Sequence, residues 1–239
     1  MIKAVLTGLF FTSLTIQALP ASDLLSSQIK TFNQIVKNTG IPATGSFCVE
    51  NIGDTSKTAR AYSAENKKSI ELTVLSSDEA MEIFQALKDD EENSFDSPLD
   101  ACFARAHRMA QVMDERDIIS GKAFVEGELF VDTKFGELGW SYHAASLVMV
   151  KHKGVLTPTI MDPTLFDRPV SYEEWKKLLI QKPKSKLKSE YFTKRFNYDI
   201  REKNADTVQY DEEQLEDMKI KIKENARMGY MIELMEKKK

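Results

Sequence analysis

The amino-acid sequence predicts an α+β fold in which an antiparallel sheet is packed by a helix that carries a cysteine. The sheet is predicted by short stretches where apolar residues alternate with polar ones, the pattern of strands with one buried face. Two of these stretches, residues 140–150 and 155–162, flank a short polar turn and therefore predict a hairpin. The helix is predicted by apolar residues at helical spacing from residue 102 onward. We also expect one extra helix near each end of the chain.

The composition is that of a water-soluble globular protein with one or two domains. Of the 239 residues, 42% are hydrophobic and 29% are charged. The formal net charge of −4 argues against nucleic acid as the main partner. The two cysteines, Cys48 and Cys102, are too few for a disulfide framework. We expect Cys48 to be a buried core thiol, and the alternative is a reversible bond to Cys102.

Residues 1–21 are predicted to be a secretory signal peptide. Lys3 supplies a positive start, an apolar stretch follows over residues 4–16, and Ala18 or Ala21 offers a small residue for cleavage. The stretch is short for a membrane span, so we expect no stable span once the signal is removed. The predicted location is secreted or periplasmic. A tethering helix and an ordinary N-terminal helix are the alternatives.

The middle of the chain, residues 66–181, is predicted to be the main domain, and residues 22–65 an N-terminal segment before it. The expected elements are, in chain order, a helix over 22–38, strands over 46–50, 59–62 and 69–75, a helix over 78–88 capped by Ser77, the cysteine helix capped by Asp100, a strand over 122–131, the hairpin, and a helix opened by the capping box Ser171 to Glu174.

The last part of the chain, residues 182–239, is predicted to be a basic linker followed by an amphipathic helix. Five lysines fall between residues 182 and 194, which is typical of a solvated segment. The helix is expected over residues 211–239, docked on the core or on a partner. Asn225 and Gly229 interrupt its apolar seam, so a stable coiled coil is not expected.

Cys102 is the candidate nucleophile. A cysteine in an apolar helix is more often a small core residue than a reactive one. Cys102, however, lies in the predicted first turn of its helix, where the positive end of the helix dipole favours the thiolate, which is the nucleophilic form. A thiol nucleophile also needs a base that takes its proton and a third group that orients the base.

The chain offers three histidines as the base, and the sequence favours His143. His107 lies five residues after Cys102 on the same helix and therefore points away from the thiol. His152 lies in a polar turn and is expected to be solvated. His143 lies in the first strand of the predicted hairpin, next to Trp140, Ser141 and Tyr142.

Asp162, in the second strand of the hairpin, is the candidate orienting group. If residues 151–154 form a four-residue loop, Val150 faces Val155, and the same register places His143 directly opposite Asp162. The carboxylate can then bond one imidazole nitrogen and leave the other for the thiol. A register slip of one residue would turn His143 to the opposite face of the sheet.

Three blocks of the sequence together resemble the bacterial secreted protein-glutaminase family. They are Asp100–Met109 (DACFARAHRM), Trp140–His143 (WSYH) and Met161–Phe166 (MDPTLF), and the resemblance covers roughly residues 70–180. By this resemblance, Cys102 is the nucleophile, His143 the general base and Asp162 the orienting acid, on a core similar to papain and transglutaminase. The implied activity is deamidation of glutamine side chains within proteins.

The resemblance also implies what the site binds. The substrates would be proteins or peptides that contain glutamine, and no cofactor or metal is expected. Trp140, Ser141 and Tyr142 are the candidate substrate-binding residues, with the two rings as walls of the glutamine slot or simply as core packing. The backbone N–H of Cys102 is the first candidate oxyanion donor, and the sequence identifies no second one.

The chain departs from the family in two ways that leave alternatives open. Relatives of this family have an inhibitory N-terminal segment, and residues 22–65 are either such a pro-segment or part of the fold. The disulfide-forming cysteines of the best-known family member are absent here. The competing functions are another acyl-transfer enzyme with the same three residues, either a transglutaminase or a cysteine peptidase, and a non-catalytic secreted interaction protein.

Overall fold

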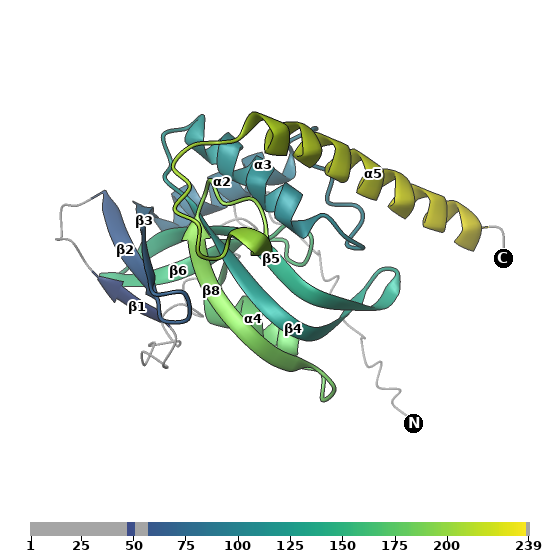
Figure 1. Cartoon of the computed structure of the whole chain (residues 1–239), viewed down its shortest axis with the longest axis horizontal. Helices are drawn as coiled ribbons and strands as arrows, with labels where there is room; N and C mark the ends of the chain where they lie inside the picture. Colours follow the sequence, from purple (N-terminus) through teal and green to yellow (C-terminus); the bar gives the residue numbers. More distant parts are fainter. Residues whose placement is uncertain (1–46, 51–56, 238–239) are drawn as a thin grey trace, which may run out of the picture.

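The computed structural model describes residues 47–50 and 57–237, and Figure 1 shows their arrangement. Eight strands of these residues join in one sheet. The strands are β1 (Phe47–Glu50), β2 (Thr58–Ser63), β3 (Lys68–Leu75), β4 (Gly121–Thr133), β5 (Gly136–His152), β6 (Val155–Met161), β7 (Val170–Ser171) and β8 (Lys186–Lys194). The α-helices of the described residues are α2 (Ser77–Lys88), α3 (Cys102–Asp114), α4 (Tyr172–Ile180) and α5 (Glu212–Glu236).

The predicted α+β class is confirmed, but the sheet is mixed and not antiparallel. Its main path runs β1-β2-β3-β5-β4-β8, with β6 paired to β5 and β7 to β6. The strands β3 and β5 run parallel through two residue pairs, Val74 with Met149 and Leu75 with Val150. The prediction missed this contact because α2, α3 and β4 separate the two strands in the chain, and no local pattern reports such a pairing. The likeness to papain and transglutaminase stays a prediction.

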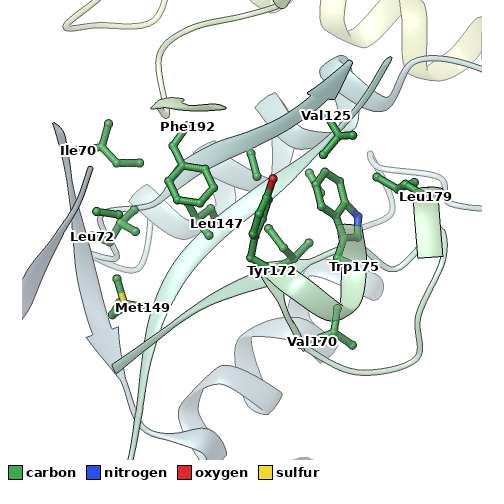
Figure 2. Close-up of a cluster of buried hydrophobic side chains, with 14 of the residues drawn as sticks. Ile70, Leu72, Val125, Leu147, Met149, Val170, Tyr172, Trp175, Leu179 and Phe192 are labelled. Carbon is green, nitrogen blue, oxygen red and sulfur yellow. The ribbon is translucent and has the colours of Figure 1, made fainter. Parts of the chain in front are cut away.

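Helices cover both faces of the sheet (Figure 1). On one face, Val148 and Val150 of β5 pack in a cluster with the buried sides of α2 and α3. On the other face, Leu147 and Met149 of the same strand pack in a cluster with Tyr172 and Trp175 of α4 (Figure 2). This alternation is the period-two pattern of a strand buried on both faces.

The β5–β6 hairpin is confirmed, but its predicted register is wrong by two residues. The turn consists of Lys153 and Gly154 alone, with φ of 49° and 84°, so His152 faces Val155. Two consecutive residues with positive φ form the tight turn that suits the twist of a hairpin. Because the shift is two residues and not one, each side chain keeps the face that the sequence predicted.

Three predicted helix starts are correct to within one residue, but one of these helices lacks the predicted side-chain cap. Ser171 caps α4 by accepting from the Glu174 N–H at 3.2 Å. The capping box of α2 is built by Ser76, one residue before the expected cap. Asp100 does not cap the cysteine helix: α3 begins at Cys102, and its N-cap is Ala101, which makes no side-chain cap bond.

The predicted basic linker is largely a strand. Residues 186–194 form β8, which pairs with β4, and residues 189–193 are buried. Lys182 and Lys186 form ion pairs with Asp132 and Glu128 of β4. The lysines suggested a solvated segment because sequence alone does not show that acidic side chains face them.

The predicted C-terminal helix is confirmed as α5, which packs on α3 through Met218 and Ile222. The predicted signal peptide over residues 1–21 and the helix over residues 22–38 lie outside the described residues, and the pro-segment stays a prediction. In the described part of the chain, no helix is both long and apolar enough to cross a membrane.

Candidate active site

Cys102 is the first residue of α3, and its backbone enters the helix through a left-handed residue. Ala101 has φ of 63°, a conformation that costs a residue with a Cβ about 1–3 kcal/mol. Strain of this kind persists only where the surroundings fix it, and here Ala101 is almost fully buried. Cys102 is a free thiol with 8% exposure. As a first-turn residue, it has a backbone N–H without a partner inside the helix.

The small residues that follow Cys102 let α3 lie close to both the sheet and α5. Ala106 is completely buried in a cluster with Val148 and Val150 of β5, and Ala104, also completely buried, packs with Met218 and Ile222 of α5. The Ser146 hydroxyl of β5 donates to the Ala106 carbonyl at 3.0 Å, which joins the helix to the strand that carries His143. The sequence thus places the thiol at the start of a helix whose first turns are tied to the sheet.

His143 is held by Asp162, as the sequence predicted, but across a diagonal of the hairpin. In the observed register Ser146 pairs with Met161, and Asp162 follows as the next residue. The His143 Nε2 lies 2.8 Å from the Asp162 Oδ2, and both side chains are almost fully buried. With Nε2 engaged in this way, Nδ1 is the ring nitrogen left to face a thiol.

Trp175 completes this arrangement, and the sequence did not identify it. Its indole N–H donates to the same Asp162 Oδ2 at 2.9 Å, and its ring centroid lies 5.6 Å from that of His143. Trp140 stacks on His143 from 4.8 Å with an interplanar angle of 15°. The sequence predicted a helix over this region, but no local pattern shows that one residue of it meets Asp162.

The protonation of His143 is set by its partners and not by its burial. Burial by itself lowers the pKa of His143, but the charge of Asp162, its hydrogen bond and a side-chain hydrogen bond with Cys102 raise it to about 9. Burial raises the pKa of Asp162, and the charge and hydrogen bond of His143, with the indole N–H of Trp175, lower it below its usual range. An imidazolium facing a thiol and held by a carboxylate can stabilise a thiolate.

A pocket of about 170 Å³ opens onto the thiol and the imidazole. It is lined by Cys102, by the run from Gly139 to His143, and by Pro98 and Asp100. The predicted substrate-binding residues Trp140, Ser141 and Tyr142 therefore all line it, with Ser141 exposed. The volume is below the 300–1,000 Å³ usual for small-molecule sites, so the pocket suits one side chain.

The loop before Cys102 is braced by α5, which the sequence assigned no part in the site. Asn225 is buried, its side-chain N–H donates to the Ser97 carbonyl at 2.7 Å, and its oxygen accepts from the Asp100 N–H at 3.1 Å. Gly229 packs against Ser97 so closely that an added Cβ would lie 2.6 Å from the Ser97 Cβ. The two residues that interrupt the apolar seam of α5 thus contact the loop that carries Pro98 and Asp100 of the pocket.

The other two histidines lie in different surroundings. His107 is fully buried, and its Nδ1 lies 2.5 Å from the Lys122 Nζ. His152 is half-buried at the end of β5. Within the described part of the chain, no group of three or more His, Cys, Asp or Glu side chains could hold a metal ion. Cys102 carries no disulfide, and the side chain of Cys48 is outside the described set.

Known proteins similar to this chain are protein-glutaminases. Residues 80–179 match a family described as glutaminase. The NMR structure of protein-glutaminase from Chryseobacterium proteolyticum matches with a TM-score of 0.54 and 27% identity, over 61% of this chain and 85% of that one. A crystal structure of protein-glutaminase matches with a TM-score of 0.50 and 27% identity, over 58% of this chain and 81% of that one. The search of curated proteins gave no match.

These matches define a class of α+β protein to which this chain is similar over about three fifths of its length. Residues 80–179 match the model of the glutaminase family, and the predicted resemblance to protein-glutaminases is confirmed. A crystal structure of pro-protein-glutaminase also matches, with a TM-score of 0.50 and 27% identity, over 62% of this chain and 53% of that one.

Proposed function

We propose that this protein hydrolyses the side-chain amide of protein-bound glutamine to glutamate and ammonia. The observation that carries the proposal is a single small pocket lined by both Cys102 and His143, with His143 held by a buried carboxylate 2.8 Å from its other nitrogen. The match of residues 80–179 to the glutaminase family supports the same chemistry. Cys102 is the proposed nucleophile, His143 the acid and base, and Asp162 the group that orients His143.

In the first half of the reaction, the Cys102 thiolate attacks the side-chain carbonyl carbon of glutamine. The carbonyl oxygen becomes an oxyanion, which the backbone N–H of Cys102 can stabilise, because the first N–H groups of a helix have no partner inside it. The His143 imidazolium donates its proton to the departing nitrogen, and ammonia leaves. The product is a thioester between Cys102 and the glutamyl side chain, with His143 now neutral.

In the second half, water hydrolyses the thioester. Neutral His143 removes a proton from water, the hydroxide adds to the thioester carbonyl, and the thiolate leaves with His143 again protonated. Asp162 keeps the imidazole in one orientation through both halves. The net change replaces the amide NH₂ by OH, so one water is consumed and one ammonia is released.

The pocket supports a side-chain amide as the substrate group. Trp140 and Tyr142 line it together with the thiol, and their rings carry an indole N–H and a hydroxyl group. Its volume of about 170 Å³ admits a glutamine side chain from a protein surface but leaves little room for a peptide backbone. This favours deamidation over peptide cleavage.

The test is ammonia release from casein and from a glutamine-containing peptide, with the Cys102→Ala protein as control. We expect the wild type to release ammonia and to add about one dalton at glutamines, the mass of the NH₂ to OH exchange. Crosslinked products would indicate a transglutaminase, and cleaved backbones a peptidase; either as the main product contradicts the proposal. Ammonia release that persists in folded Cys102→Ala would also contradict it.

A further inference from the structure

Arg105 is a buried cation one helical turn after Cys102. The two residues are three positions apart on α3 and so lie on neighbouring parts of one helix face. Arg105 is 2% exposed. A guanidinium keeps its charge at any physiological pH, and a buried charge is costly unless something compensates it. The sequence did not single out this residue.

The hydrogen bonds of Arg105 do not compensate its charge. The Arg105 Nη1 donates to the Ser97 carbonyl at 3.1 Å, and the Arg105 Nε is buried without a hydrogen-bond partner. Among the described residues no carboxylate forms an ion pair with it, whereas Arg108 on the same helix pairs with Asp90 at 2.8 Å. Arg105 is therefore kept inside the protein without an ion-paired acid of its own.

The charges that act on Arg105 belong to the candidate site. Burial lowers the pKa of Arg105, and the nearby Cys102, Asp162 and Asp100 raise it, with Cys102 the strongest of these three. In return, the charge of Arg105 contributes to lowering the pKa of Asp162.

Arg105 makes the buried site neutral in total charge. Asp162 carries one negative charge, and the Cys102–His143 pair is neutral in total whether its proton lies on sulfur or on nitrogen. Without Arg105 the buried site would carry a net charge of −1, and with Arg105 it is neutral. A thiolate forming beside a buried carboxylate is disfavoured by repulsion, and a neighbouring cation offsets this.

We propose that Arg105 is a positioning residue whose buried charge favours the Cys102 thiolate and the Asp162 carboxylate, and whose Nη1 also fixes the Ser97–Pro98 wall of the pocket. The inference rests on the proposed function, because it assigns Arg105 a part in the same site. The two effects can be separated, because Asn225 binds the same Ser97 carbonyl without bringing a charge.

The experiment measures the rate of Cys102 alkylation by iodoacetamide between pH 5 and pH 10, with peptide mapping so that Cys48 is scored separately. In Arg105→Gln, we expect the profile to move to higher pH and the rate at pH 6 to fall by about tenfold, the effect of one pH unit. Arg105→Lys keeps the charge, so its profile should stay close to that of the wild type. Asn225→Ala loosens the loop at Ser97 and Asp100 without changing any charge, and it should keep the midpoint of the profile.

Three results would overturn the inference. The first is an Arg105→Gln profile that coincides with the wild type in a folded protein. The second is an equal displacement in Asn225→Ala, which would reduce Arg105 to a tether of the loop. The third is a displaced profile in Arg105→Lys, which decides the matter even if Arg105→Gln does not fold. Alkylation needs no glutamine substrate, so a protein that fails to deamidate can still pass this test, and an active one can fail it.

Discussion

Two buried histidines in this protein have opposite protonation, and the comparison shows that partners, and not burial, decide it. His143 is 2% exposed and His107 is fully buried. The pKa of His143 rises to about 9 because the charge and hydrogen bond of Asp162, together with the contribution of Cys102, outweigh the effect of burial. The pKa of His107 falls to about 2, because burial is there reinforced by the nearby amine of Lys122. A carboxylate beside a buried imidazole favours its protonated form, whereas an amine beside it favours its neutral form.

The two surroundings also differ in what their polar atoms can do. Around His143, the Asp162 Oδ2 accepts from both the imidazole and the indole of Trp175, and a pocket lies open beside the ring. Around His107, Lys122 lies against the ring and donates to the Asn197 carbonyl at 2.5 Å, while His107 Nε2 has no hydrogen-bond partner. The first network faces a pocket, and the second ties α3, β4 and the segment after β8 together.

The change with the largest expected effect is Asp162→Asn. It removes the charge that offsets burial at His143, so the pKa of His143 should fall well below 9 and the thiolate should lose its cationic neighbour. We expect the rate of deamidation to fall by about a thousandfold, and the NMR titration of His143 to move to lower pH while His107 stays neutral. Asp114→Asn, which changes a half-buried partner of Arg195 and Tyr210 away from the pocket, is the matched control and should retain activity. Full activity in Asp162→Asn would refute the assigned role.

The pH dependence of stability should have opposite signs at the two histidines. The pKa of His143 is raised from 6.5 to about 9, so its stabilising contribution is complete below pH 6.5 and is lost as pH rises through 9. The free-energy loss in His143→Gln should therefore be greatest at low pH, on the order of 3 kcal/mol, and shrink towards pH 9.5. Because His107 stays neutral when folded, His107→Gln should instead gain relative stability as pH falls below 6.5.

Urea unfolding of the wild type and both variants from pH 5 to pH 9.5 measures these slopes. Each variant serves as the control for the other, since both remove a buried imidazole and differ in its partner. Parallel slopes in the two variants would show that burial, and not the partner, governs both groups.

The sequence predicted those parts of the fold and site that depend on neighbours in the chain. The cap at Ser171, the hairpin strands, and His143 and Asp162 as partners follow from local spacing and alternation. The register was wrong because Lys153, a residue that rarely takes positive φ, forms the tight turn with Gly154. The two-residue error left both side chains on their predicted face, which is why the pairing of His143 with Asp162 survived it.

The parts that the sequence could not predict depend on contacts between distant segments. Trp175 meets Asp162 because α4 packs against the sheet, and Asn225 meets Ser97 because α5 crosses the loop before Cys102. Asp100 has the side chain of a good cap, but its backbone N–H binds Asn225 and the helix begins two residues later. Tertiary contacts of this kind override local preference, and no spacing within one segment reports them.

The smallest expected effect is that of Trp175→Phe, which tests the hydrogen bond from the Trp175 indole to Asp162. This change keeps an aromatic ring in the core but removes the indole N–H that donates to Asp162, so the pKa of the carboxyl should rise. A hydrogen bond to a charged group is worth about 1.5–3 kcal/mol, and we expect deamidation to fall by about tenfold.

Tyr172→Phe is the matched control, because it removes another buried hydrogen bond of α4, to Glu190, that lies outside the pocket. Both variants should lose stability, but only Trp175→Phe should weaken the interaction between Asp162 and His143. Equal losses of activity in the two variants would mean that the indole acts through packing alone, and that the charge of Asp162 orients the imidazole without help from a neutral donor.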